Sequence, residues 1–188
     1  YALNKKIKEL FPEYKVEHIG YLNSEHRATY FEKRKPKLRL QGKFYQLIFY
    51  KSVYRYFLGL QKYYKEPKQL YKIFSAACNS IPHISVSTSN ELEELKWDKI
   101  VTGSDCIWQF STESFGTDVH LIGKSLHYNK LIGYACSFGN QSGNIPSFVP
   151  EQLMKYDYVS IRDTFSENLV DNLTGGLCKT SLVLDPTL

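Results

Sequence analysis

The chain has 188 residues, of which 43% are hydrophobic and 23% are charged, and this composition is typical of a globular protein with one substantial domain. It contains no uncharged apolar run of roughly 18 residues or more, which excludes an ordinary membrane-spanning helix. Its four cysteines are widely spaced and form no C-x-x-C pair, which argues against a zinc site and a disulfide framework and favours a reduced, cytoplasmic setting.

The charge is distributed unevenly along the chain. Residues 1–80 hold 17 Lys and Arg against 6 Asp and Glu, whereas residues 81–188 hold 7 against 13. The overall charge of +5 therefore combines a basic, tyrosine-rich first part with an acidic second part. Together with the sequence patterns below, this predicts a βα core over 84–188 and a basic, aromatic, helical insertion over 24–80.

The first predicted elements are a helix and a strand. Residues 1–11 are amphipathic and end at Pro12, and residues 16–21 alternate in the manner of a strand. A helix followed by a strand, with no strand before it, matches a βαβ unit that lacks its first strand. We therefore expect the sequence to be a fragment that lacks the first strand of its domain.

The insertion contains a long helical candidate over 42–64. Its Lys and Arg side chains, continuing to residue 65, fall on one arc of the helix and aromatic residues fill much of the rest. A basic amphipathic helix of this kind favours a membrane surface or another anionic partner. The alternative is a helix packed on its own domain with a solvated basic face. No recognition motif accompanies the basic residues, so we expect no nucleic-acid binding.

From residue 84 onward, short apolar strands alternate with helices. Strands are predicted at 84–87, 98–102, 130–136, 158–161 and 181–184, and helices after the capping box Thr88-x-x-Glu91 and at 150–156 and 164–173. This alternation indicates the α/β class: a Rossmann-like, doubly wound parallel sheet with flanking helices and right-handed crossovers.

Polar residues follow three successive strands, namely Asp105, Ser137 and Arg162. Because the carboxyl ends of parallel strands meet at one edge of a sheet, we expect an acid, a hydroxyl and a guanidinium to line a shared cleft. Structural alternatives exist for two of them. Arg162 pairs only with Asp163 or Asp105, or Asp105 only caps a helix.

Three further residues carry side chains of types that take part in catalysis. His120 and His127 lie in a stretch predicted to be irregular, and each is either a base in the site or an ordinary surface or core histidine. Cys106 lies inside the predicted site and is either a nucleophile or a small packing residue.

Four sequence blocks together resemble the polysaccharide pyruvyl transferase family. They read DKIVTGSDCIW at 98–108, IGYACSFG at 132–139, VSIRD at 159–163 and LDPT at 184–187. Their order and spacing agree with the family over roughly 90–188. The sequence departs from many relatives at Cys106, where they carry Gln, and at Gln109, where they carry Asn.

The resemblance implies two Rossmann-like domains that face each other across a cleft, similar to the B-type glycosyltransferases. Residues 1–188 would then supply one half, a truncated N-terminal domain, without the C-terminal domain, and would be inactive alone. Family members transfer pyruvate from phosphoenolpyruvate to two hydroxyls of a sugar as a ketal. No cofactor and no metal is expected. The remaining implied partner is a glycan or lipid-linked sugar acceptor of a surface or capsular polysaccharide.

The resemblance also implies roles for individual residues. Arg162 would bind the carboxylate or phosphate of the donor, and Asp105 would orient or deprotonate a sugar hydroxyl, which makes these two the catalytic candidates. Backbone N–H groups and aromatic rings would contact phosphate and sugar. The predicted substrate-binding residues are Gly103, Ser104, Trp108, Ser137, Phe138 and Gly139. The turn at Asp185-Pro186 is predicted to be an exit from the domain without a ligand.

Two alternative functions remain open at this point. One is a nucleotide-sugar glycosyltransferase of the same architecture, and the other is a non-catalytic polysaccharide-assembly partner that docks through its basic helix. The expected location is cytoplasmic, with peripheral contact at the inner membrane face through 42–65 as a further expectation.

Overall fold

The computed structural model describes residues 2–23, 72–73, 75–76, 79–103, 106–111 and 118–185. The chain divides into two compact units, of which one comprises Tyr1–Glu25 with Pro82–Leu188 and the other His26–Ile81. In the second unit, residues 72–73, 75–76 and 79–80 are helical. The predicted basic helix over 42–64 lies outside the described residues. No helix in the described part of the chain is long and apolar enough to cross a membrane.

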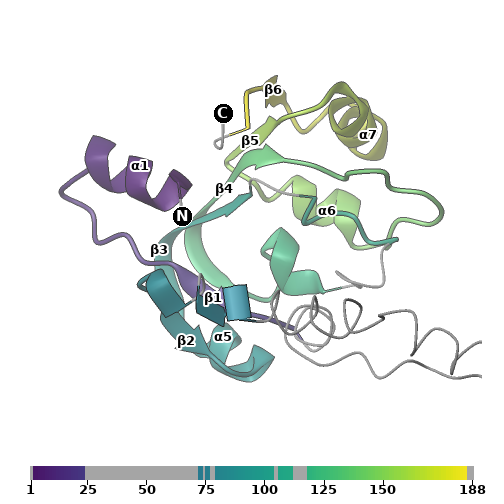
Figure 1. The fold of residues 1–188 in the computed structure, drawn as a ribbon. Coiled ribbons are helices and arrows are strands. Elements are labelled where there is room, and N and C mark those ends of the chain that lie inside the picture. Colours follow the sequence, from purple (N-terminus) through teal and green to yellow (C-terminus); the bar gives the residue numbers. More distant parts are fainter. Residues whose placement is uncertain are drawn as a thin grey trace, which may run out of the picture. The chain divides into compact units, whose positions relative to one another are not determined.

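The first unit is organised around a four-stranded parallel sheet (Figure 1). Its strands, in spatial order, are β3 (Lys96–Gly103), β4 (His127–Cys136), β5 (Tyr158–Ile161) and β6 (Thr180–Leu182). The spatial order follows the chain order, so each connection carries the chain one strand further in the same direction. The predicted Rossmann-like α/β class with a parallel sheet is therefore confirmed.

Helices connect and flank these strands. They are α1 (Ala2–Leu10), α5 (Ser89–Glu94), the short 3₁₀ helix η1 (Val119–Ile122), α6 (Val149–Leu153) and α7 (Thr164–Thr174). A second parallel pair consists of β1 (Ile19–Tyr21) and β2 (Ile84–Val86).

The predicted strands are present, but β3 and β4 begin at Lys96 and His127, a few residues earlier than their apolar centres indicate. Their first residues are polar and exposed, so hydrophobicity does not mark them.

The two faces of the sheet are covered differently. Ile100 and Leu131, which are partners in the β3–β4 register, belong to a core cluster that also includes residues of α6 and α7. Lys99 points to the other face by strand alternation, and there its ammonium group lies 3.0 Å from the hydroxyl of Tyr14, just beyond α1. The sheet is thus flanked by chain segments on both faces, as a doubly wound fold requires.

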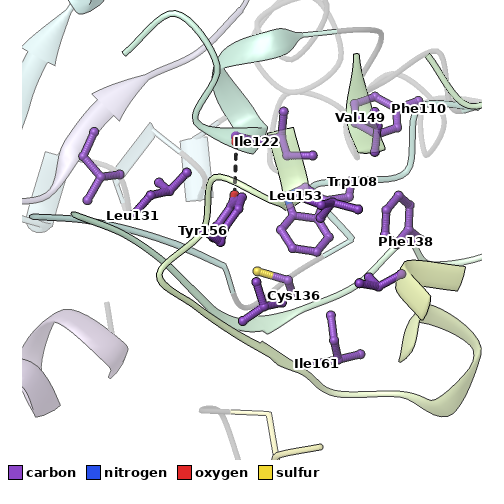
Figure 2. Close-up of a cluster of buried hydrophobic side chains, with 13 residues drawn as sticks. Trp108, Phe110, Ile122, Leu131, Cys136, Phe138, Val149, Leu153, Tyr156 and Ile161 are labelled. Carbon is purple, nitrogen blue, oxygen red and sulfur yellow. Dashed lines mark hydrogen bonds between the residues drawn. The ribbon is translucent and has the colours of Figure 1, made fainter. Parts of the chain in front are cut away.

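The core cluster is built around aromatic side chains (Figure 2). The ring of Trp108 lies 5.3 Å from that of Phe138 and 5.6 Å from that of Tyr156, measured between centroids. The Tyr156 hydroxyl donates to the carbonyl oxygen of Ile122 at 3.1 Å, and it also contacts the Thr102 hydroxyl at 3.0 Å. The polar end of this buried ring is therefore satisfied inside the core.

Helix starts follow the sequence signals. At α5, the Thr88 hydroxyl accepts a hydrogen bond from the N–H of Glu91 at 3.2 Å, which confirms the predicted cap. The Glu91 carboxylate in turn accepts from the N–H of Ser87 at 2.8 Å, one residue before the position of a standard capping box. At α7, Asp163 is the N-cap and accepts from the N–H of Ser166 at 2.7 Å.

The pairing of β4 with β5 is irregular at one place, and the side chain of Ser160 supplies hydrogen bonds to the backbone there. The register shifts between Gly133 and Cys136, and Ala135 adopts a φ of 50°, which a residue with a side chain rarely does. The fully buried Ser160 hydroxyl donates to the carbonyl oxygen of Gly133 at 3.2 Å and accepts from the N–H of Ala135 at 3.1 Å. Two backbone groups at the irregularity therefore have partners.

Candidate functional site

An ion pair lies where β5 and β6 end. Arg162 directly follows β5, and its Nη1 atom lies 2.5 Å from Oδ2 of Asp185, just beyond β6. The two side chains are 22% and 20% exposed, so the pair is mostly buried yet still reaches the surface. A short, charge-assisted contact of this kind restricts the long arginine side chain to few orientations.

The backbone fixes where both partners lie. The N–H of Arg162 donates to the carbonyl oxygen of Cys136 at 3.3 Å, and the N–H of Val183 donates to that of Ile161 at 2.8 Å. These bonds continue the parallel pairing beyond the ends of β5 and β6. Arg162 and Asp185 consequently emerge at the same edge of the sheet.

The segment that follows β3 reaches the same place. Nη2 of Arg162 lies 3.5 Å from the sulfur of Cys106, within the range of a weak hydrogen bond to sulfur. The guanidinium therefore lies between the carboxylate of Asp185 and the thiol of Cys106. Three strand ends are brought together by one side chain.

The loop after β4 packs against the segment after β3. The N–H of Trp108 donates to the carbonyl oxygen of Ser137 at 3.3 Å. A Cβ atom at Gly139 would lie 2.6 Å from Oε1 of Gln109 and 3.0 Å from Cβ of Cys106, and φ at Gly139 is 56°. Only glycine satisfies both the conformation and the close approach, so this position keeps the two loops in contact.

Of the two predicted catalytic residues, the structure describes one. Arg162 lies at the carboxyl edge of the sheet as expected, whereas Asp105 and the neighbouring Ser104 lie outside the described residues. Gly103 ends β3 with a φ of 144°, and a Cβ atom there would lie 1.9 Å from the carbonyl oxygen of Tyr134. The backbone at this predicted turn therefore requires glycine.

The predicted aromatic contacts do not fit the observed burial. Trp108 and Phe138 have no exposed surface, because their rings pack on each other in the core cluster (Figure 2). They support the edge of the sheet from beneath instead of presenting a face to a sugar. This is a correction to the predicted stacking role: an aromatic residue in a loop next to polar residues has the same sequence pattern in either case.

Ser137 is likewise turned inward. Its side chain is buried, its hydroxyl accepts from the N–H of Gly139 at 2.9 Å, and it lies 3.4 Å from the hydroxyl of Ser166. The Ser166 hydroxyl also accepts from the N–H of Phe138 at 2.8 Å and donates to Asp163 at 3.0 Å. This hydroxyl network joins the loop after β4 to the start of α7, so the Ser137 side chain shapes the loop rather than exposing a hydroxyl.

The structure gives Arg162 a partner that the sequence alternatives did not include. The alternative pairing with Asp105 lies outside the described residues. Asp163, adjacent in sequence, caps α7 with both carboxylate oxygens. The pairing with Asp185 was missed, since the turn after β6 was predicted to be only an exit from the domain. The signal that could have found it is the parallel register, which brings the ends of neighbouring strands together.

The two candidate histidines are placed elsewhere. His127 is exposed at the first residue of β4, whereas the arginine lies at the opposite ends of the strands. His120 lies in η1 with Nδ1 2.7 Å from Asp118 and Nε2 2.8 Å from Glu93, so both ring nitrogens have carboxylate partners. Its surroundings are those of a structural histidine that links η1 to α5.

Burial has the largest effect on the pKa of the Cys136 thiol, which lies next to the site. It raises the pKa of the Cys136 thiol to about 12, although a hydrogen bond from Thr102 and the charge of Arg162 act in the opposite direction. Cys136 therefore stays a neutral thiol at physiological pH. Within the described ranges, no three His, Cys, Asp or Glu side chains gather in a way that could hold a metal ion.

These features define a class before any comparison: an α/β protein with a parallel sheet whose carboxyl edge carries a restrained guanidinium, the place where such sheets bind ligands. The chain belongs to the polysaccharide pyruvyl transferase family, because the model of that family matches residues 1–188, the whole chain. The resemblance predicted from the four sequence blocks is thereby confirmed, and the family is one of transferases. No curated protein and no solved structure matches the chain.

Proposed function

We propose that the protein transfers the pyruvyl group of phosphoenolpyruvate to two hydroxyls of one sugar in a surface or capsular polysaccharide. Both oxygens bond to the central carbon of the donor to form a cyclic ketal. The methylene carbon gains one proton and becomes a methyl group, the bond from the central carbon to the phosphate oxygen breaks, and phosphate leaves with the other proton. No cofactor takes part in this proposal, and its acceptor is a glycan or a lipid-linked sugar.

The single observation that supports this proposal is the position of Arg162 at the carboxyl edge of the sheet in a chain of this family. Phosphoenolpyruvate carries a carboxylate and a phosphate, and a guanidinium binds either group through paired N–H donors. Because the side chain is mostly buried, its charge is screened less by water than that of an exposed arginine. Asp105 is proposed as the base for the attacking hydroxyls.

The experiment compares the full-length protein with its Arg162→Ala and Arg162→Lys variants, by measuring phosphate release from phosphoenolpyruvate in the presence of acceptor glycan. We expect Arg162→Ala to lower kcat/KM by about 10²-fold or more, with partial retention in Arg162→Lys. Glu151→Gln is the matched control, because this residue on α6 is exposed and forms an ion pair with Lys155, just beyond the end of the helix. Unchanged pyruvylation in Arg162→Ala would remove Arg162 from the mechanism.

The same assay separates the alternative functions. Release of a nucleoside diphosphate from a nucleotide sugar, with no phosphate from phosphoenolpyruvate, would identify a glycosyltransferase. If neither donor is consumed, the role as a non-catalytic polysaccharide-assembly partner replaces the enzymatic one.

Peripheral membrane association of this cytoplasmic enzyme is a separate part of the proposal, and it rests on the basic residues of 42–65. Co-sedimentation with anionic vesicles tests it. We expect the wild type to sediment and a variant with Gln for Lys and Arg in this segment to stay in solution.

A further inference from the structure

We propose that Asp185 is a positioning residue for the donor-binding arginine, an inference that rests on the proposed function. Nη1 of Arg162 is 2.5 Å from the carboxylate of Asp185, and this contact joins the ends of two adjacent strands. Asp185 determines which edge of the guanidinium faces the donor. Without it, Arg162 would keep its charge but lose the contact that holds its Nη1 atom.

Each terminal nitrogen of the guanidinium has a contact among the described residues. Asp185 lies at Nη1, and the sulfur of Cys106 lies 3.5 Å from Nη2. An arginine side chain has several rotatable bonds, and its planar fork recognises an anion well only when the plane is correctly aligned. Contacts at both terminal nitrogens fix that plane relative to the carboxyl edge of the sheet.

The backbone makes Asp185 a precise anchor. The N–H of Val183 bonds to the carbonyl oxygen of Ile161 at 2.8 Å, directly before Arg162. The pairing of β6 with β5 therefore fixes the position of the main chain just before Asp185. A carboxylate two residues beyond this bond starts from a fixed position, and catalysis tolerates only small displacements of the groups that bind substrate.

The negative charges of the donor and of Asp185 indicate that Asp185 acts through Arg162 and does not bind the donor directly. Phosphoenolpyruvate is an anion, and an ionised carboxylate repels its carboxylate and phosphate at short distance. The same negative charge is favourable when it is shared with the guanidinium. The expected effect of losing Asp185 is therefore weaker and less well-oriented donor binding.

The test uses the full-length protein with Asp185→Asn, Arg162→Ala and the double variant, with Glu151→Gln as the exposed control. For Asp185→Asn we expect a fall in kcat/KM for phosphoenolpyruvate of about 10- to 100-fold, carried mainly by KM. In the Arg162→Ala background the same substitution should change kcat/KM by less than about twofold, because a residue that acts through the arginine has nothing left to position.

Two kinetic results would overturn the proposal. A further large loss in the double variant would mean that Asp185 contacts the substrate itself. Wild-type kinetics for Asp185→Asn would mean that the ion pair only links β5 to β6. If Asp185→Asn does not fold, Asp185→Glu replaces it, since it keeps the charge and shifts the carboxylate by one methylene; an intermediate rise in KM is expected, and no change would count against the proposal.

A measurement made in the absence of phosphoenolpyruvate distinguishes failure of this inference from failure of the proposed function. Nitrogen-15 relaxation of the Arg162 side-chain Nε–H measures how rigidly the guanidinium is held. We expect a rigid signal in the wild type and a mobile one in Asp185→Asn, whether or not phosphoenolpyruvate is the donor. An equally rigid signal in both proteins would refute positioning, whereas the absence of phosphate release from the wild type would refute only the proposed reaction.

Discussion

The hydroxyl of Ser160 accepts a hydrogen bond from the N–H of Ala135 at 3.1 Å, where the register of the ladder between β4 and β5 shifts. This contact, with the bond to the carbonyl oxygen of Gly133, lets β4 adopt an irregular backbone just before the loop that leads to the candidate site. A buried serine in a strand thus supports the position of functional residues without contacting them.

Replacing Ser160 with alanine should destabilise the protein by about 1–3 kcal/mol, because two buried backbone groups lose a partner. Urea unfolding measures the change. Ser181→Ala is the matched control, since Ser181 is the register partner of Ser160 on β6 and is only partly buried; its cost should be about 0.5 kcal/mol or less. Equal costs for the two variants would contradict the assigned role of Ser160.

Gly103→Ala should be among the most damaging substitutions at the carboxyl edge. The added methyl group would lie 1.9 Å from the backbone oxygen of Tyr134, and φ at this residue is 144°. We expect a loss of roughly 3 kcal/mol or more, or failure to fold, because the strand ends must separate. Gly143→Ala, where φ is 79° and nothing lies within 4 Å, should cost only about 1–2 kcal/mol in thermal unfolding.

Stability should fall in acid through Asp118. Burial alone would raise the pKa of this carboxyl, but hydrogen bonds from the backbone and ring of His120 and from Asn23 bring it below its ordinary value. A carboxyl with a lowered pKa stabilises the fold above its unfolded pKa of about 4 and loses that contribution as the pH falls through the lower folded value.

Urea midpoints measured from pH 6 downward test this sign. Asp118→Asn should be less stable than wild type at pH 6, and the difference should shrink as the pH falls below about 4. Glu151→Gln serves as the exposed carboxyl control. A constant difference between Asp118→Asn and wild type across this range would contradict the linkage.

Alkylation of the cysteines should follow their environment. Cys136 is fully buried and its pKa is raised to about 12, so we expect no reaction with iodoacetamide at pH 8 in the folded protein. Cys106 is partly exposed next to Arg162 and should react first, more slowly when phosphoenolpyruvate is bound. Site-resolved mass spectrometry measures both rates, and reaction of Cys136 before Cys106 would contradict the burial described above.

The order of strands and helices was predictable because each strand contains a compact apolar block and several helices carry clear caps. Ile100 in β3 and Leu131 in β4 belong to such apolar blocks, and Thr88 is such a cap. The edge at which Arg162 emerges follows from these elements alone, since parallel strands end on the same side.

The contacts within the site were not predictable in the same way. The sequence analysis considered Asp163 or Asp105 as a partner of Arg162. The Asp163 carboxylate instead caps α7, and the observed partner Asp185 comes from the turn after the next strand. Burial decides the roles of Trp108 and Ser137, and short loops with mixed polarity carry no periodic signal of which side chains turn inward. Which side chains pair across neighbouring strands is therefore seen only in the three-dimensional structure.

The close approach of Gly139 to Cys106 and Gln109 has an evolutionary consequence. Because residue 139 has no space for a side chain, the loop after β4 and the segment after β3 cannot change in sequence independently of each other. Relatives with bulkier residues at 106 or 109 should carry compensating changes in the segment around 138–140. Substitutions in these two loops are then expected to occur in pairs, with a change in one loop accompanied by a change in the other.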